Sequence, residues 1–153
     1  NIDLLKTNLE KKEYKVSVFD NKEEAAEYLN KEIDGLTVGM GGSMTAKAMC
    51  LYESLNEHNT VYSHRGASAE ERAAIMKAAQ TADIYISSVN GVSETGELVN
   101  IDGTCQQHFS DIKRYISLSV PIRLRKILIK QSGGQGTLHH RLTVKGSVLI
   151  RLV

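Results

Sequence analysis

Helix-like and strand-like segments alternate through the first hundred residues of this chain, and this alternation restricts the fold more than any other feature. Residues 14–19 alternate between apolar and polar side chains, as in a half-buried strand. Ala25, Leu29 and Ile33 then recur every fourth residue, as on the buried face of a helix. A chain that alternates in this way forms βαβ units, so we predict an α/β fold with a Rossmann-like parallel sheet and flanking helices.

Capping residues mark the same boundaries as the periodicity. Asn21 and Ser68 are each followed three residues later by a glutamate, which is the pattern of a helix-capping box. Short apolar segments at 36–38, 60–62 and 84–87 have the length of buried strands. A helical pattern over 48–55 and another after Ser68 separate these strands, so the alternation extends along most of residues 1–104.

The strand at 36–38 runs directly into a glycine-rich loop, residues 39–45. Glycines let the backbone approach a ligand closely, and amide groups at a helix start, together with hydroxyl groups, can hold an anion. We therefore predict that a carboxylate or phosphate binds at Gly39, Gly41, Gly42, Ser43 and Thr45. The alternative is a tight turn without a ligand, since the loop matches neither the dinucleotide-binding pattern nor the P-loop, which has a lysine before the serine or threonine.

Two further polar segments follow predicted strands, namely His64 and residues 90–96. Ligands of open parallel sheets bind beyond the carboxyl ends of the strands, so we expect these two segments and the glycine-rich loop to converge on one cleft. Glu94 is a carboxylate set among small residues, and it is the candidate general base or covalent nucleophile. The alternatives are an ordinary turn glutamate and a solvated histidine.

The composition is that of one soluble domain. Hydrophobic residues make up 41% of the chain and charged residues 24%, and no apolar run approaches the roughly 18 to 20 residues that a spanning helix needs. Cys50 and Cys105 lie far apart and lack the spacing of metal ligands, so we predict neither a disulfide nor a metal site. These features lead us to expect a cytoplasmic protein.

Residues 83–104, with the sequence DIYISSVNGVSETGELVNIDGT, closely resemble the characteristic segment of the LUD domain. This is the lactate-utilisation family that was formerly classed as of unknown function. The glycine-rich loop resembles the loop of the same family, and the resemblance covers nearly all of residues 1–104. The residues of this segment that we assign to the ligand site are Asn90, Gly91, Gly96, Asn100, Asp102, Gly103 and Thr104.

The resemblance implies a sheet of the NagB/RpiA/CoA-transferase-like type and a role in the oxidation of L-lactate to pyruvate. It implies partner proteins with iron–sulfur clusters, and no cofactor is assigned to this chain. The small anionic ligand predicted from the glycine-rich loop is then a carboxylate, a phosphate or a CoA-like molecule. Residues 93–96 are also similar to the Ser-Glu-Asn-Gly element of CoA transferases, whose glutamate forms an acyl-CoA anhydride, although Thr95 stands in place of asparagine. The alternative functions are therefore CoA or acyl transfer, and a non-catalytic subunit that docks iron–sulfur partners.

The chain departs from the family pattern at several positions. Arg65 follows His64 where an aromatic residue is expected, and Cys50 occupies a place that is usually small and often glycine. The largest departure begins after Thr104, where the family continues with Gly-Asn-Arg-Val and a helix. We therefore divide the chain into a partial LUD domain, residues 1–104, and a tail outside the family pattern, residues 105–153.

A step in charge coincides with this division. Residues 1–103 hold 10 Lys and Arg against 17 Asp and Glu, whereas residues 104–153 hold 9 against 1. Codons permitted for residues 130–139, translated one base out of register, encode AVWRARNIA, which resembles the downstream sequence of the family. We therefore interpret the tail as frameshifted, with little regular structure, and the chain as a truncated, inactive copy. Residues 122–129 could form a helix and residues 142–153 a strand, but we expect neither to continue the βαβ pattern.

The alternative is a genuine tail that binds nucleic acid or another acidic surface. Arg123, Arg125, Lys126 and Lys130 form a basic cluster that suits such a partner. The frameshift interpretation makes this cluster an accident of register, and it predicts no nucleic-acid partner.

The frameshift interpretation makes a prediction about the gene. The codons from Gly103 to Gln107 should carry a deletion whose length is not a multiple of three, relative to intact genes of the family. The nucleotide sequence of this region is the measurement. A frame that aligns without interruption to intact relatives through these codons would contradict the interpretation.

Overall fold

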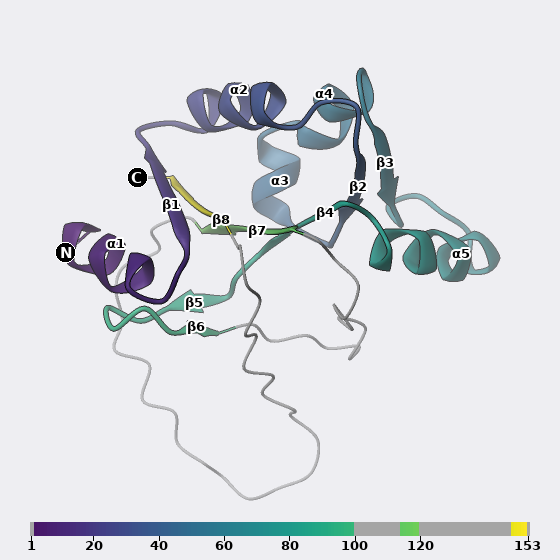
Figure 1. The fold of residues 1–153 in the computed structure, drawn as a ribbon. Helices are drawn as coiled ribbons and strands as arrows, with labels where there is room; N and C mark the ends of the chain where they lie inside the picture. The colour runs from purple at the N-terminus through teal and green to yellow at the C-terminus, as the bar shows by residue number, and fades with distance from the viewer. Residues whose placement is uncertain (1, 100–113, 120–147, 153) are drawn as a thin grey trace, which may run out of the picture.

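The computed structural model describes residues 2–99, 114–119 and 148–152 (Figure 1). The helices in this part of the chain are α1 (Ile2–Glu10), α2 (Lys22–Glu32), α3 (Met44–Ala48), α4 (Leu51–Asn56) and α5 (Ala69–Gln80). The strands are β1 (Lys15–Phe19), β2 (Thr37–Met40), β3 (Thr60–Ser63), β4 (Ile84–Ser88), β5 (Gly91–Val92), β6 (Leu98–Val99), β7 (Arg114–Ser119) and β8 (Val148–Leu152).

Six strands of the described segments form one parallel sheet in the order β1-β8-β7-β4-β2-β3. β2 lies between β3 and β4, and its register places Met40 opposite Ser63 on one side and Ile86 on the other. Parallel neighbours need crossover connections, and among the described residues α3 and α4 connect β2 to β3 while α5 connects β3 to β4. The predicted α/β fold with a parallel sheet and flanking helices is confirmed.

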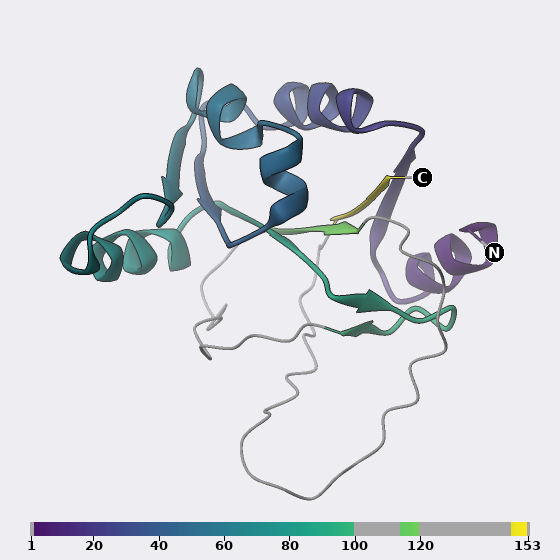
Figure 2. The ribbon, with the colours of Figure 1, turned by 180° about the vertical axis from the view of Figure 1, so that it is seen from behind.

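Helices cover both faces of the sheet, as the two opposite views show (Figures 1 and 2). α2, α3 and α4 lie on one face, where their apolar residues pack on β2, β4 and β7 in a single core. The largest fully buried side chains of this core are Leu29, Ile33, Leu51, Leu55, Ile84, Ile86, Ile116 and Leu118. On the opposite face α5 lies against β2 and β3, and α1 lies against β1. Burial of these apolar side chains is the main stabilising contribution.

Both predicted helix caps are present, but only Ser68 forms a complete capping box, because Glu24 Oε1 accepts from Asn21 Nδ2 and not from the Asn21 backbone amide. Asn21 Oδ1 accepts a hydrogen bond from the Glu24 amide at 2.9 Å, and Ser68 Oγ accepts one from the Glu71 amide at 3.3 Å. The Ser68 amide in turn donates to Glu71 Oε2 at 3.0 Å. These bonds satisfy amide groups that have no partner within the helix, which is why α2 and α5 begin where they do.

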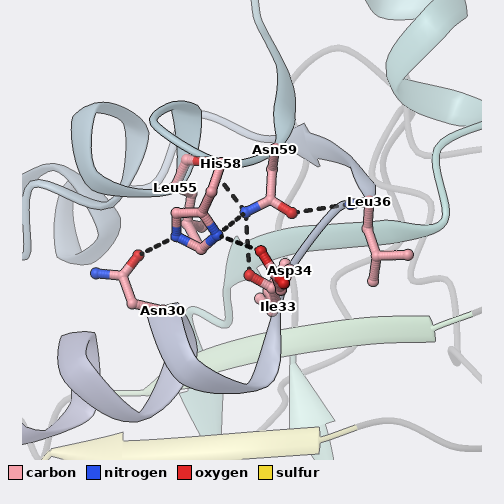
Figure 3. A network of polar contacts seen from close by, with 7 residues as sticks. All are labelled: Asn30, Ile33, Asp34, Leu36, Leu55, His58 and Asn59. Atoms are coloured by element: carbon pink, nitrogen blue, oxygen red, sulfur yellow. Dashed lines mark hydrogen bonds and ion pairs between the residues drawn. The ribbon is translucent and has the colours of Figure 1, made fainter.

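A polar network joins the ends of two helices to the start of β2 (Figure 3). Asn59 Oδ1 accepts from the Leu36 amide at 2.9 Å, while Asn59 Nδ2 donates to the carbonyls of Ile33 and Leu55, both at 3.0 Å. In the neighbouring residue His58, the Nδ1 atom lies 3.1 Å from Asp34 Oδ1. Because one amide side chain satisfies three backbone groups, the ends of α2 and α4 are held beside the entry to β2.

The tail contributes more to the sheet than the sequence predicts. β7 and β8 both lie beyond residue 104, and each pairs in parallel with its neighbours. The expectation that this segment does not continue the βαβ sheet is therefore wrong for 114–119 and 148–152. Ile116 and Leu118 alternate with Tyr115 and Ser117, and the two aliphatic side chains enter the main core, so a short alternating run is enough to add a strand.

The helical pattern after the glycine-rich loop forms two short helices rather than one. Cys50 separates α3 from α4 with a φ of 50°, in the left-handed region. A Cβ in this conformation meets the following carbonyl, at a cost of about 1–2 kcal/mol. Glycine adopts this conformation without strain, which explains why the family often has glycine where this chain has Cys50.

Replacing Cys50 with glycine should stabilise the fold. We expect Cys50→Gly to raise the free energy of unfolding by about 1 kcal/mol, since relief of the left-handed strain exceeds the added entropy of the unfolded chain. Cys50→Ala is the matched control, because it removes the thiol and keeps the Cβ. Urea unfolding measures both variants, and a glycine variant no more stable than the alanine variant would show that Cys50 is not strained.

Candidate functional site

A cavity of about 380 Å³ opens where β2 and β3 end. Its wall combines the end of β2, the glycine-rich loop, the two short helices and the segment after β3. The lining residues are Met40, Gly41, Ser43, Ala46, Lys47, Tyr52, Glu53, Ser63 and Arg65. This is the carboxyl edge of a parallel sheet, where ligands of such folds bind.

Backbone hydrogen bonds hold the glycine-rich loop against β4. The Gly41 amide donates to the Ile86 carbonyl at 3.0 Å, and the Ser43 amide donates to the Gly41 carbonyl at 2.8 Å. Ser43 is buried, and its Oγ accepts from the Ala46 amide at 2.9 Å and also contacts Ser88 Oγ. The serine hydroxyl therefore caps α3 and ties the loop to the end of β4.

Arg65 closes the cavity from the β3 side. Its Nη2 donates to the Ser43 carbonyl at 3.1 Å, and its own amide donates to Ser63 Oγ at 3.4 Å. A guanidinium group carries five N–H donors in a planar arrangement, so one bond to a carbonyl leaves other donors for a ligand. Among the charged side chains of the lining, Lys47 and Arg65 are positive and Glu53 is negative, which leaves a net positive cavity.

Comparison with known proteins decides the family. The sequence model of the LUD domain matches residues 2–108. The chain belongs to the LUD domain family. No curated protein and no solved structure matches the chain.

Only two of the five residues that we predicted to bind a ligand in the glycine-rich loop of this LUD domain line the cavity. Gly41 and Ser43 line the cavity, whereas Gly39, Gly42 and Thr45 are not among the lining residues. A Cβ on Gly39 would lie 2.6 Å from the Ala79 carbonyl oxygen, so this glycine serves close packing of β2 on α5. Gly42 has open space around its Cα.

The characteristic LUD segment around Glu94 lies against α1 rather than at the cavity. Asn8 Nδ2 donates to the Glu94 carbonyl at 2.8 Å, and Gly96, with a φ of 80°, packs on the backbone of Asn8 and Leu9. Val92 and Leu98 of the β5–β6 hairpin pack with the second core cluster, which includes residues of α1. Glu94 itself is exposed.

The loops that we expected to converge therefore do so only in part. The glycine-rich loop meets the segment after β3, but neither His64 nor residues 90–96 line the cavity. Asn90 is exposed and Gly91 begins β5 on the way to α1. Asn100, Asp102, Gly103 and Thr104 lie outside the described residues.

Sequence reasoning missed most of the cavity side chains. Lys47 lies one helical turn after Ser43, and this i, i+4 spacing indicates that both side chains face the same side of the helix. Arg65 was visible only as a departure from the family. Tyr52 and Glu53 follow the break at Cys50, and that break brings the start of α4 to the cavity.

Two side chains outside the cavity have shifted pKa values. Hydrogen bonds from the backbone amide and the hydroxyl of Ser68 lower the pKa of Glu71 at the start of α5. Burial raises the pKa of Tyr14 beside the second core cluster. Both are structural groups. The described residues contain no group of three or more His, Cys, Asp or Glu side chains that could hold a metal ion, and none of their helices is long and apolar enough to cross a membrane.

Proposed function

We propose that this LUD-domain chain is related to the components that oxidise L-lactate to pyruvate, and that its cavity binds the carboxylate of a small organic acid. The family is associated with lactate utilisation. The observation that carries the proposal is the position of Arg65, whose guanidinium lines the cavity while one of its nitrogens is held by the Ser43 carbonyl. This bond orients the cation beside the glycine-rich loop.

Charge supports a monocarboxylate as the ligand. Lys47 and Arg65 together exceed Glu53 by one positive charge, so one carboxylate neutralises the cavity. Guanidinium binds carboxylate through paired N–H donors, and such charge-assisted bonds are roughly twice as strong as neutral ones. The side chain of Ser63 in the same wall offers a hydroxyl to the C2 oxygen of a hydroxy or keto acid.

The alternative of CoA or acyl transfer receives less support. It requires Glu94 beside the bound acyl group, whereas Glu94 belongs to the hairpin on α1 and does not line the cavity. Iron–sulfur proteins stay the expected partners, as the family resemblance implies, and the proposal keeps a cytoplasmic location.

The proposal treats this chain as a defective copy that retains the binding cavity. Every lining residue falls between Met40 and Arg65, inside the family match, which ends at residue 108. The end of the match close to Thr104 supports the proposed frameshift. Ligand binding and catalysis are therefore separable in this chain, and binding is the activity to measure.

Thermal unfolding with added acids tests the proposal. L-lactate or pyruvate at about 100 times its Kd should stabilise the full chain by about 2.7 kcal/mol, because it binds only the folded state. Arg65→Gln should abolish this shift, since the cavity then loses its excess positive charge.

Arg72→Gln is the matched control. Arg72 is an exposed arginine on α5 and does not line the cavity, so its replacement should leave the ligand shift unchanged. The proposal fails when neither acid shifts the unmodified chain, or when both arginine variants lose the shift equally.

A further inference from the structure

We infer that the acid bound in this cavity carries a bulky apolar or aromatic substituent, so that the ligand class is 2-hydroxy or 2-keto acids larger than lactate. The inference rests on the proposed function, because it takes the carboxylate at Arg65 as given. It adds a second recognition element, the Tyr52 ring together with the apolar wall beside it.

The size of the cavity is the first argument. Lactate has about six non-hydrogen atoms, and since bonded atoms occupy less than the roughly 30 Å³ of a free water molecule, it fills less than roughly 180 Å³. The cavity holds about 380 Å³, about twice that volume. A 3-phenyl substituent brings the acid to about twelve non-hydrogen atoms and less than roughly 360 Å³ on the same scale. An acid of the size of phenyllactate therefore fits the cavity, whereas lactate leaves at least half of it empty.

The chemistry of the wall is the second argument. Met40 on β2 and Ala46 on α3 are 4% and 3% exposed, so they form an apolar base that already belongs to the main core. The charged groups surround this base, with Arg65 after β3, Lys47 on α3 and Glu53 on α4. A ligand with one anionic end and one apolar end places its carboxylate at Arg65 and its apolar part over this base beside Tyr52.

Tyr52 is the third argument. It stands in the first turn of α4 and is 42% exposed, among the few large hydrophobic side chains with such exposure in the described segments. An aromatic ring at the edge of a cavity can cover a ligand ring in an offset-stacked or edge-to-face arrangement. A ligand ring in contact with Tyr52 would therefore bury an aromatic side chain that is partly exposed in the protein alone.

Binding measured by calorimetry on the full chain tests this inference with two probes, L-lactate and L-3-phenyllactate. We expect phenyllactate to bind at least about tenfold more tightly than lactate, because its ring adds buried apolar surface and an aromatic contact. Tyr52→Ala should remove about tenfold of the phenyllactate affinity and less of the lactate affinity, so that the preference for phenyllactate falls, whereas Arg72→Gln outside the cavity should leave both affinities unchanged. Tyr52→Phe should keep the preference, because it keeps the ring.

The outcomes separate this inference from the proposed function. Equal affinity for the two acids, with both lost in Arg65→Gln, would overturn the preference for a large substituent and leave the carboxylate site intact. The absence of binding by either acid would overturn both. A preference for phenyllactate that survives Tyr52→Ala would also contradict the role of the ring. Circular dichroism of each variant establishes that it is folded, and Tyr52→Phe tests the ring when the alanine variant does not fold.

Discussion

The close packing of β2 between β4 and α5 is the constraint on which the cavity depends. A Cβ at Gly39 would lie 2.6 Å from the Ala79 carbonyl oxygen and 2.7 Å from Tyr85 Cδ2, closer than real atoms approach. At the start of the same strands, Thr37 and Asp83 exchange side-chain and backbone hydrogen bonds of 2.7 to 3.1 Å. These contacts fix the start and the middle of β2. They therefore also fix the position of the glycine-rich loop, which follows the end of β2.

Local patterns in the sequence predict the elements well, because each depends on neighbouring residues. The N-cap residues Asn21 and Ser68 fix the starts of α2 and α5 as predicted, although only Ser68 forms the complete capping box. The cavity depends instead on contacts between distant residues, such as Arg65 with Ser43. Such a contact produces no periodic pattern in the sequence. Arg65 was therefore noticed only as a departure from the family, and Gly39 was predicted to bind a ligand although it serves packing.

The position of Glu94 also depends on contacts between distant residues, which its sequence motif does not reveal. A parallel sheet directs its loops to one edge, which led us to expect residues 90–96 beside the glycine-rich loop. The apolar residues Val92 and Leu98 instead turn the hairpin onto Leu5 and Leu9 of α1, where it completes a second small core. Burial of these side chains outweighs the direction of the preceding strand. The contact with the glycine-rich loop is made by β4 itself, through the Ile86 carbonyl and the Ser88 hydroxyl.

A crystal structure of the full chain soaked with L-lactate tests the central claim, that the cavity at the ends of β2 and β3 is the ligand site, most directly. The account predicts the carboxylate on the Arg65 guanidinium, with N–H···O distances of about 2.7–2.9 Å. Lactate bound at the β5–β6 hairpin beside Glu94, with the cavity lacking the acid, would contradict it.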